Sequence, residues 1–271
     1  MTVSLTQGLL IGLFAIIAGI DFWLEGFYIF RPMIVCTVTG LILGDLKLGI
    51  VAGGLTELAF AGLTPVGGTQ PPNPVMAGIM TVVLAYTTGH TPATAIGLAL
   101  PFSILMQYII LFYYSFFSIL TKKLDEYAEK AETRKFSLLV LAPTVIVAIT
   151  YGIIAFLSVY GAQEPMRALV NSMPGWLSHG FEIAGGILPA VGFGVLLKSM
   201  LKGEFMPYLL LGFTAACFIK FGNLMPVAII GTALAIIEFY HDKKDADNDK
   251  KMKEIAAAAQ NNGDGDDEDG I

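Results

Sequence analysis

The chain has 271 residues, of which 55% are hydrophobic and only 14% charged, and its mean hydropathy is +0.70. Soluble globular domains carry about 25% charged residues, so this composition excludes an ordinary soluble protein and predicts an integral membrane protein. The formal net charge is −6 and the sequence contains no basic stripe, which argues against a nucleic-acid partner.

Apolar runs occupy most of the chain, at about 5–20, 22–44, 48–66, 75–88, 92–120, 136–159, 181–197, 205–219 and 224–240. A membrane-spanning helix needs about 20 mostly apolar residues. The runs 92–120 and 136–159 meet that length, and 5–20 lacks the cleavage site of a signal peptide, so we expect it to stay in the membrane. Several other runs are too short or too broken by Gly, Pro or charge. The predicted fold is therefore an all-α polytopic transporter with discontinuous helices and re-entrant hairpins.

Lys and Arg residues are distributed unevenly between the predicted loops. The loop 160–180 carries only Arg167, whereas the loop 121–135 carries Lys122, Lys123, Lys130, Arg134 and Lys135. Because cytoplasmic loops are enriched in these residues, we expect 121–135 inside and 160–180 outside.

The chain ends in a strongly acidic segment. Residues 242–271 hold 10 acidic residues against 5 Lys, which places most of the excess negative charge there. The segment 263–270 offers no apolar face, so we expect no packed core in it. The sequence therefore predicts a membrane-embedded permease domain at 1–241 and an acidic, disordered cytoplasmic tail at 242–271.

One carboxylate and a polar, helix-breaking loop interrupt the apolar sequence between residues 53 and 74. Glu57 lies in the string Gly53-Gly54-Leu55-Thr56-Glu57-Leu58, and the loop reads Gly67-Gly68-Thr69-Gln70-Pro71-Pro72-Asn73-Pro74. Irregular backbone at membrane depth occurs only where protein buries it or where it lines a cavity. An ionisable group there is a functional-site hypothesis. We expect this segment to handle a polar solute.

The side chains of this segment suit a hydroxylated ligand. A carboxylate accepts hydrogen bonds from adjacent sugar hydroxyls and pairs with an ammonium group, which makes Glu57 the first candidate. The amides of Gln70 and Asn73 both donate and accept, as a sugar hydroxyl does. The alternatives are a plain surface turn and a structural ion pair of Glu57 with Lys47 or Arg31.

A second charged set interrupts the first apolar stretch, at Asp21, Glu25, Arg31 and Asp45. Here we expect Arg31 to pair with one of the three acids in a structural ion pair or an interfacial anchor, in preference to contacting a ligand. A glycine-rich and proline-containing segment, 183–194, occupies a corresponding place in the second half of the chain. It suggests a site between two repeats, with close packing of small residues as the other explanation.

The sequence shows no catalytic apparatus. His90, His179 and His241 are scattered, without a second ligand at metal spacing or a nucleophile beside them. Cys36 and Cys217 lie in apolar segments and form neither a disulfide framework nor a metal set. No phosphate-binding P-loop is present, so we expect no cofactor and no direct use of ATP. The chain has the character of a permeation unit that relies on other proteins for chemistry.

These strings resemble the membrane IIC subunit of the mannose-type family of the bacterial phosphoenolpyruvate-dependent sugar phosphotransferase system. The likeness spans nearly all of 5–240 and is carried by Phe30-Arg31-Pro32, Leu43-Gly44-Asp45, Gly53 to Leu58, Gly68 to Pro74 and Ile183 to Phe193. The strings Asp21-Phe22-Trp23-Leu24-Glu25 and Thr56 to Pro74 look most like the galactosamine and N-acetylgalactosamine branch.

The resemblance implies a mechanism and a set of partners. A IIC subunit pairs with a IID membrane subunit, as a trimer of heterodimers in the inner membrane, and a core domain moves the sugar against a scaffold domain. A cytoplasmic IIB subunit, supplied by IIA, passes phosphate to the incoming sugar, and IIC itself is not phosphorylated. By the same resemblance, Glu57, Thr69, Gln70 and Asn73 are the expected sugar-binding residues.

Two other classes of function stay open at this point. One is an ion-coupled secondary sugar transporter, in which Glu57 would be the coupling carboxylate. The other is a membrane scaffold or receptor without transport, whose activity would be insensitive to the loss of Glu57.

Overall fold

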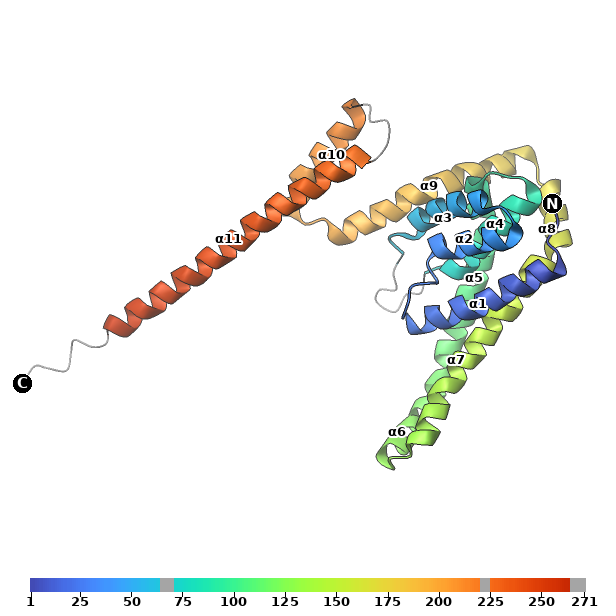
Figure 1. Cartoon of the computed structure of the whole chain (residues 1–271), viewed down its shortest axis with the longest axis horizontal. Helices are drawn as coiled ribbons and strands as arrows, with labels where there is room; N and C mark the ends of the chain where they lie inside the picture. Colours follow the sequence, from blue (N-terminus) through green and yellow to red (C-terminus); the bar gives the residue numbers. More distant parts are fainter. Residues whose placement is uncertain (64–70, 220–224, 264–271) are drawn as a thin grey trace, which may run out of the picture. The chain divides into compact units, whose positions relative to one another are not determined.

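The computed structural model describes residues 1–63, 71–219 and 225–263, and all regular structure in those ranges is helical (Figure 1). The chain divides into two compact units, Met1–Met200 and Leu201–Ile271. The first unit contains the helices α1 (Leu5–Leu24), α2 (Pro32–Leu43), α3 (Leu46–Phe60), α4 (Pro74–Thr88), α5 (Pro92–Phe117), α6 (Thr121–Glu129), α7 (Thr133–Phe156), α8 (Gln163–Ser172) and α9 (Gly175–Met200). The second contains α10 (Met206–Phe218) and α11 (Met225–Gly263). The all-helical prediction is confirmed.

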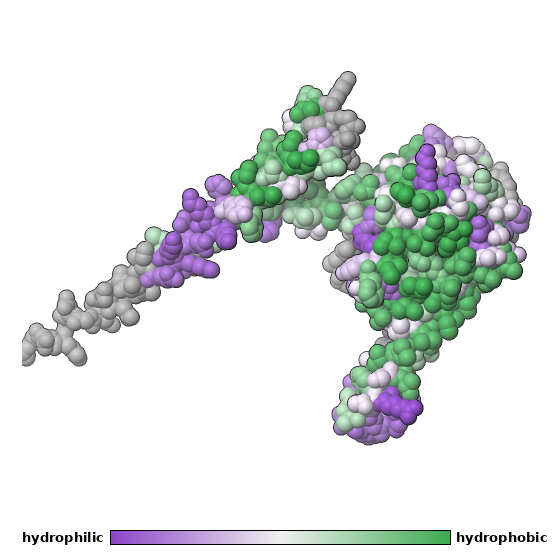
Figure 2. All heavy atoms as spheres, in the orientation of Figure 1, coloured by the Kyte–Doolittle hydropathy of each residue, from purple (hydrophilic) through white to green (hydrophobic). Residues whose placement is uncertain are grey.

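Five helices of the described chain are long and apolar enough to cross a membrane. They are α1, the α5–α6 run Pro92–Glu129, the α7 run Thr133–Gly161, α9 and the first part of α11, Met225–Glu254. On the visible face of the first unit hydrophobic residues cover most of the surface, while hydrophilic residues gather at α6 (Figure 2). An apolar outer surface of this kind suits lipid, which cannot hydrogen-bond to exposed polar groups.

Helices α2 and α3 form a tight hairpin that is too short to cross a membrane. They contain 12 and 15 residues, and a helix rises about 1.5 Å per residue. Gly44 makes the turn with φ 86°, and Asp45 then caps α3 by accepting a hydrogen bond from the amide of Leu48 at 2.9 Å. A Cβ atom on Gly40 would lie 2.6 Å from the Cα of Gly49, so the two helices touch through backbone. This pair matches the hairpin that the broken apolar pattern predicts.

Helix α4 is the centre of the first unit. It packs against α2, α3 and α5, and the stretch 75–85 is buried on every face. A helix that is apolar all round is expected in an interior. Its start at Pro74 follows directly from the polar loop, so the loop ends inside the protein.

The second unit carries the C-terminal segment, whose helix is longer than the sequence suggests. Helix α11 continues through residues 242–254, where acidic residues and Lys are interspersed, and ends at Gly263. Opposite charges three or four residues apart and the alanines at 256–259 support helix. The helix therefore extends into the segment predicted to be disordered, whereas 264–271 lies outside the described residues.

Candidate functional site

Glu57 on α3 is held by Arg31, the residue that precedes α2. The guanidinium Nε donates to Oε1 of Glu57 at 2.7 Å, and Nη2 approaches the same oxygen. The other carboxylate oxygen, Oε2, accepts the amide of Met33 at 3.1 Å. The side chains of Arg31 and Glu57 are 38% and 24% exposed, so the pair is partly open. Of the two partners proposed from sequence for Glu57, Arg31 is the observed one.

A pocket of about 260 Å³ opens beside this ion pair. It is lined by residues from the end of α1, the α1–α2 connection and the first residue of α2, and by residues at or after the end of α3 and at or before the start of α4: Phe22, Glu25, Tyr28, Phe30, Arg31, Pro32, Phe60, Leu63, Pro71 and Pro74. Pockets for drug-sized ligands hold about 300–1,000 Å³, so this one suits a single small molecule. Aromatic walls with a few charged groups are typical of sites that bind the apolar faces and the hydroxyls of a sugar.

The α1–α2 connection takes its shape from Asp21. Its carboxylate accepts the backbone amides of Phe27 at 2.6 Å and Phe30 at 3.2 Å, and the residue is only 5% exposed. Glu25 and Tyr28 in this connection have φ values of 50° and 61°, in the left-handed region that non-glycine residues rarely adopt. Buried carboxylate–amide hydrogen bonds stabilise such a path. Asp21 thus holds in place the segment that contributes four residues to the pocket.

The structure corrects the predicted partner of Arg31. We expected Asp21, Glu25 or Asp45, but Asp21 binds backbone amides, Asp45 caps α3, and Arg31 pairs with Glu57. Residues 31 and 57 come together because α2 and α3 are antiparallel, which places the start of one helix beside the end of the other. From sequence this pair is one of two alternatives for Glu57, and the closure of the hairpin decides between them.

Asn73 is fully buried and caps α4. Its Oδ1 accepts the amide of Met76 at 3.0 Å, and its Nδ2 donates to the hydroxyl of Tyr151 on α7. Its backbone amide donates to the carbonyl of Ser103 at 3.1 Å, and the Ser103 hydroxyl donates to the Asn73 carbonyl at 2.8 Å. Asn73 therefore ties α4 to α5 and α7, between the pocket residues Pro71 and Pro74. The other two loop candidates, Thr69 and Gln70, lie outside the described residues.

The glycine-rich segment of the second half serves close helix packing. A Cβ atom on Gly185 of α9 would lie 1.8 Å from the carbonyl oxygen of Ala93 in α5. One on Gly192 would lie 2.3 Å from the carbonyl oxygen of Leu58 in α3. Such approaches leave no room for a side chain, so the packing explanation holds at these two positions.

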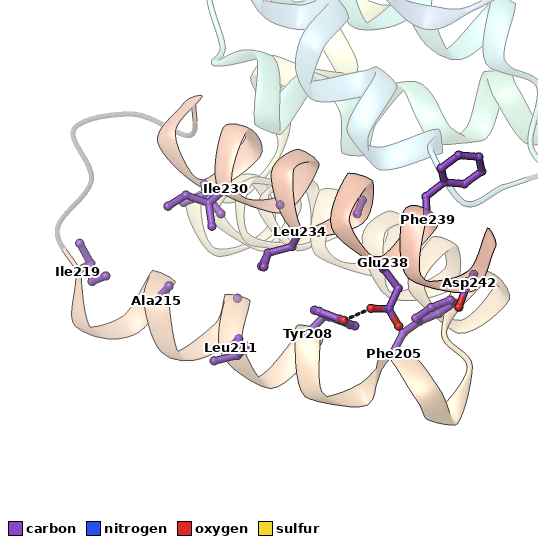
Figure 3. Close-up of a pocket in the computed structure, with 14 residues that line it drawn as sticks. Phe205, Tyr208, Leu211, Ala215, Ile219, Ile230, Leu234, Glu238, Phe239 and Asp242 are labelled. Atoms are coloured by element: carbon purple, nitrogen blue, oxygen red, sulfur yellow. Dashed lines mark hydrogen bonds between the residues drawn. The ribbon is translucent and has the colours of Figure 1, made fainter. Parts of the chain in front are cut away.

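A second pocket, of about 670 Å³, lies between α10 and α11 (Figure 3). Its lining is largely apolar, with Leu211, Ala215, Ile230 and Leu234 among the residues drawn. The clearest polar contact is a hydrogen bond from the Tyr208 hydroxyl to Oε2 of Glu238, at 2.6 Å. A sugar needs a hydrogen-bond partner for each buried hydroxyl, so this lining suits it poorly.

Comparison with known proteins identifies the family. Residues 5–237 match the protein family described as PTS system sorbose-specific IIC component, where PTS denotes the phosphotransferase system. The chain belongs to this family. It is a sugar-translocating IIC membrane subunit of a phosphoenolpyruvate-dependent phosphotransferase system, a multi-pass protein of the inner membrane that works with the other components of that system. The resemblance drawn from sequence is confirmed, and an ion-coupled secondary transporter is not favoured.

Individual relatives cover nearly the whole chain. The N-acetylgalactosamine permease IIC component 1 of Escherichia coli (strain K12) is 57% identical over 241 residues, which is 89% of this chain and 90% of the relative. The sorbose-specific EIIC component of Klebsiella pneumoniae is 32% identical over 238 residues, 88% of this chain and 89% of the relative.

Solved structures with the same fold also belong to membrane proteins. One described as a membrane protein has a TM-score of 0.75 and 29% identity, with 88% of this chain and 96% of that chain covered. The mannose transporter ManYZ in complex with microcin E492 has a TM-score of 0.55 and 27% identity, with 89% and 97% covered. The IIC fold is thus shared over most of the chain.

Proposed function

We propose that this IIC subunit binds and translocates an amino sugar, N-acetylgalactosamine or galactosamine. The observation that carries the proposal is the pocket of about 260 Å³ beside the Arg31–Glu57 pair, with aromatic side chains in its walls. Its size and composition suit one monosaccharide. The 57% identity to a relative named for N-acetylgalactosamine supports the choice of sugar.

We further propose that Glu57, Thr69, Gln70 and Asn73 contribute to sugar binding. Glu57 faces Arg31, which lines the pocket, and Asn73 lies between two residues that line it. Each of the two still has hydrogen-bonding capacity, because a carboxylate offers about four lone pairs and an amide offers two donors. Arg31 joins this set as a donor to sugar hydroxyls.

The proposed assembly contains a IID membrane subunit, as a trimer of IIC–IID heterodimers, served by cytoplasmic IIB and IIA phosphocarriers. The likeness to the mannose transporter ManYZ supports a membrane partner. Phosphate transfer from IIB to the sugar gives a charged product, which cannot return through an apolar barrier. In this scheme the IIC subunit recognises the sugar and provides its path across the membrane.

The test is uptake of labelled sugar by cells that contain the subunit together with its IID, IIB and IIA partners. We expect N-acetylgalactosamine or galactosamine to accumulate as the phosphate, and right-side-out vesicles to require internal phosphoenolpyruvate. Collapse of the proton and sodium gradients should leave vesicle uptake unchanged. Uptake that follows an ion gradient without phosphoenolpyruvate would contradict the proposal, and omission of IID is the control for assembly.

A further inference from the structure

The pocket beside Glu57 contains an unbalanced negative charge. Two charged residues line it, Glu25 and Arg31, and Arg31 is already neutralised by Glu57. Among the residues that the structure describes, the Glu25 carboxylate makes no hydrogen bond and no ion pair. The wall of the pocket therefore has one net negative charge, and Glu25 is its source.

Glu25 occupies a place where a carboxylate is unfavourable in two ways. It caps the C-terminus of α1 with φ 50°, and its amide donates to the carbonyl of Asp21. Glycine is the usual residue at this conformation, because a Cβ atom is strained there. The C-terminal end of a helix also carries partial negative charge, which disfavours a further anion. Residues that break such rules without a hydrogen-bonding or ion-pairing partner in the described part of the chain are expected at functional sites.

The surroundings of Glu25 favour a cation with an apolar body. The aromatic rings of Phe22 and Phe30 meet edge to face with their centroids 5.3 Å apart, and the ring centroids of Tyr28 and Phe30 are 5.6 Å apart. All three line the pocket. Aromatic faces attract ammonium groups and also cover the C–H face of a sugar ring.

We propose that Glu25 binds the protonated amine of a free hexosamine and is the residue that makes the pocket prefer galactosamine over its N-acetylated form. The inference rests on the proposed function, since it assigns one group of the same sugar site. The Arg31–Glu57 pair then hydrogen-bonds to the sugar hydroxyls, and Glu25 recognises the amine nitrogen. Acetylation removes the positive charge, so an N-acetyl sugar gains only a weaker neutral hydrogen bond from Glu25.

The experiment measures KM for uptake of labelled galactosamine and N-acetylgalactosamine by the complete IIC–IID complex in cells with IIB and IIA. For Glu25→Gln we expect the KM for galactosamine to rise about tenfold and that for N-acetylgalactosamine to change less than about threefold. Glu25→Asp, which keeps the charge, should retain part of the preference. Glu129→Gln removes an exposed carboxylate on α6, away from the pocket, and should leave both KM values unchanged.

A second measurement needs no variant. With the wild-type complex, galactosamine should inhibit uptake of the labelled substrate at least about tenfold more strongly than galactose, which lacks the amine. Equal inhibition by the two sugars, or equal KM shifts of both substrates in Glu25→Gln, would overturn the role of Glu25 while the proposed sugar site stands. If the wild type transports neither amino sugar, the proposed function fails, and this inference fails with it.

Discussion

Arg31 and Glu57 form an ion pair across the α2–α3 hairpin, with Nε of Arg31 2.7 Å from Oε1 of Glu57. The pair joins the first residue before α2 to the last turn of α3. It therefore holds the Arg31 side chain at the pocket wall while leaving the two charges balanced. A balanced pair can exchange hydrogen bonds with a neutral sugar at little electrostatic cost, whereas an isolated carboxylate at membrane depth is expensive.

The first prediction concerns this pair. Glu57→Gln should lower sugar uptake by at least about tenfold, because the neutral amide binds the guanidinium less strongly than a carboxylate and is a weaker acceptor for sugar hydroxyls. Membrane insertion should be unchanged on an immunoblot of the membrane fraction. Arg31→Gln should have a similar effect, and the double variant should lose less than the product of the two single losses. Normal uptake by Glu57→Gln would count directly against the site.

The second prediction separates the structural and ligand-binding roles of Asn73. Asn73→Ser keeps an acceptor for the cap of α4 but loses the amide that donates to the Tyr151 hydroxyl. Tyr151→Phe removes that same hydrogen bond by taking away its acceptor. Loss of one buried partner costs about 1–3 kcal/mol, so both variants should be less stable to heat in detergent. Only Asn73→Ser should also reduce uptake, by about tenfold, since Asn73 lies in the chain between the pocket residues Pro71 and Pro74, whereas Tyr151 belongs to α7. Equal uptake in the two variants would restrict Asn73 to its cap.

The third prediction concerns Asp21 as a positioning residue. Asp21→Asn leaves one oxygen to serve two amides, so the connection 25–31 should loosen and the KM for sugar should rise several-fold. The maximal rate should fall much less, because the rest of the fold does not depend on this contact. Asp45→Asn is the matched control, since Asp45 also accepts a backbone amide but caps α3 away from the pocket. A loss of maximal rate without a change in KM would indicate a purely structural role.

The fourth prediction concerns backbone contact in the hairpin. Gly40→Ala would place a methyl group 2.6 Å from the Cα of Gly49, and overpacking of this kind costs about 1–3 kcal/mol. The melting temperature of the purified subunit should fall. Gly54→Ala is the control within the same hairpin, because its new Cβ atom meets nothing within 4 Å. It should be neutral or slightly stabilising, since alanine favours helix by about 1 kcal/mol over glycine. Equal melting temperatures of the two variants would refute the contact.

Sequence was sufficient for the helical class and for the segment that borders the pocket. Hydropathy and helix-breaking residues follow local rules, so the long helices α5 and α7 and the short α2–α3 hairpin could be anticipated. The choice of Glu57 as a candidate also rested on one local fact, a carboxylate in an apolar run, and its role in sugar binding stays a prediction.

Sequence could offer alternatives for the partners of these residues but could not choose among them, because the choice depends on how distant helices meet. Asp45 and Lys47 are close to Arg31 and Glu57 in the chain, but the antiparallel hairpin joins residues 31 and 57 instead. From sequence, Asn73 is a loop residue with an amide side chain, yet it donates a hydrogen bond to Tyr151 on α7, which is 78 positions away in the chain. The sequence also gives no sign that Glu25 adopts a left-handed conformation, since that depends on how Asp21 folds the connection.

The hydrogen bonds that Asp21 accepts from main-chain amides matter for the redesign of sugar specificity. Because the hydrogen bonds of this carboxylate, among the described residues, come from the backbone N–H groups of residues 27 and 30, it specifies the course of the connection without specifying the side chains attached to it. The exposed positions 25 and 28 can then be exchanged while their Cα atoms stay where they are. The backbone of the α1–α2 connection is thus fixed separately from the side chains that face the sugar. Substitutions in this connection are therefore the natural way to change the sugar preference while the rest of the permease stays the same.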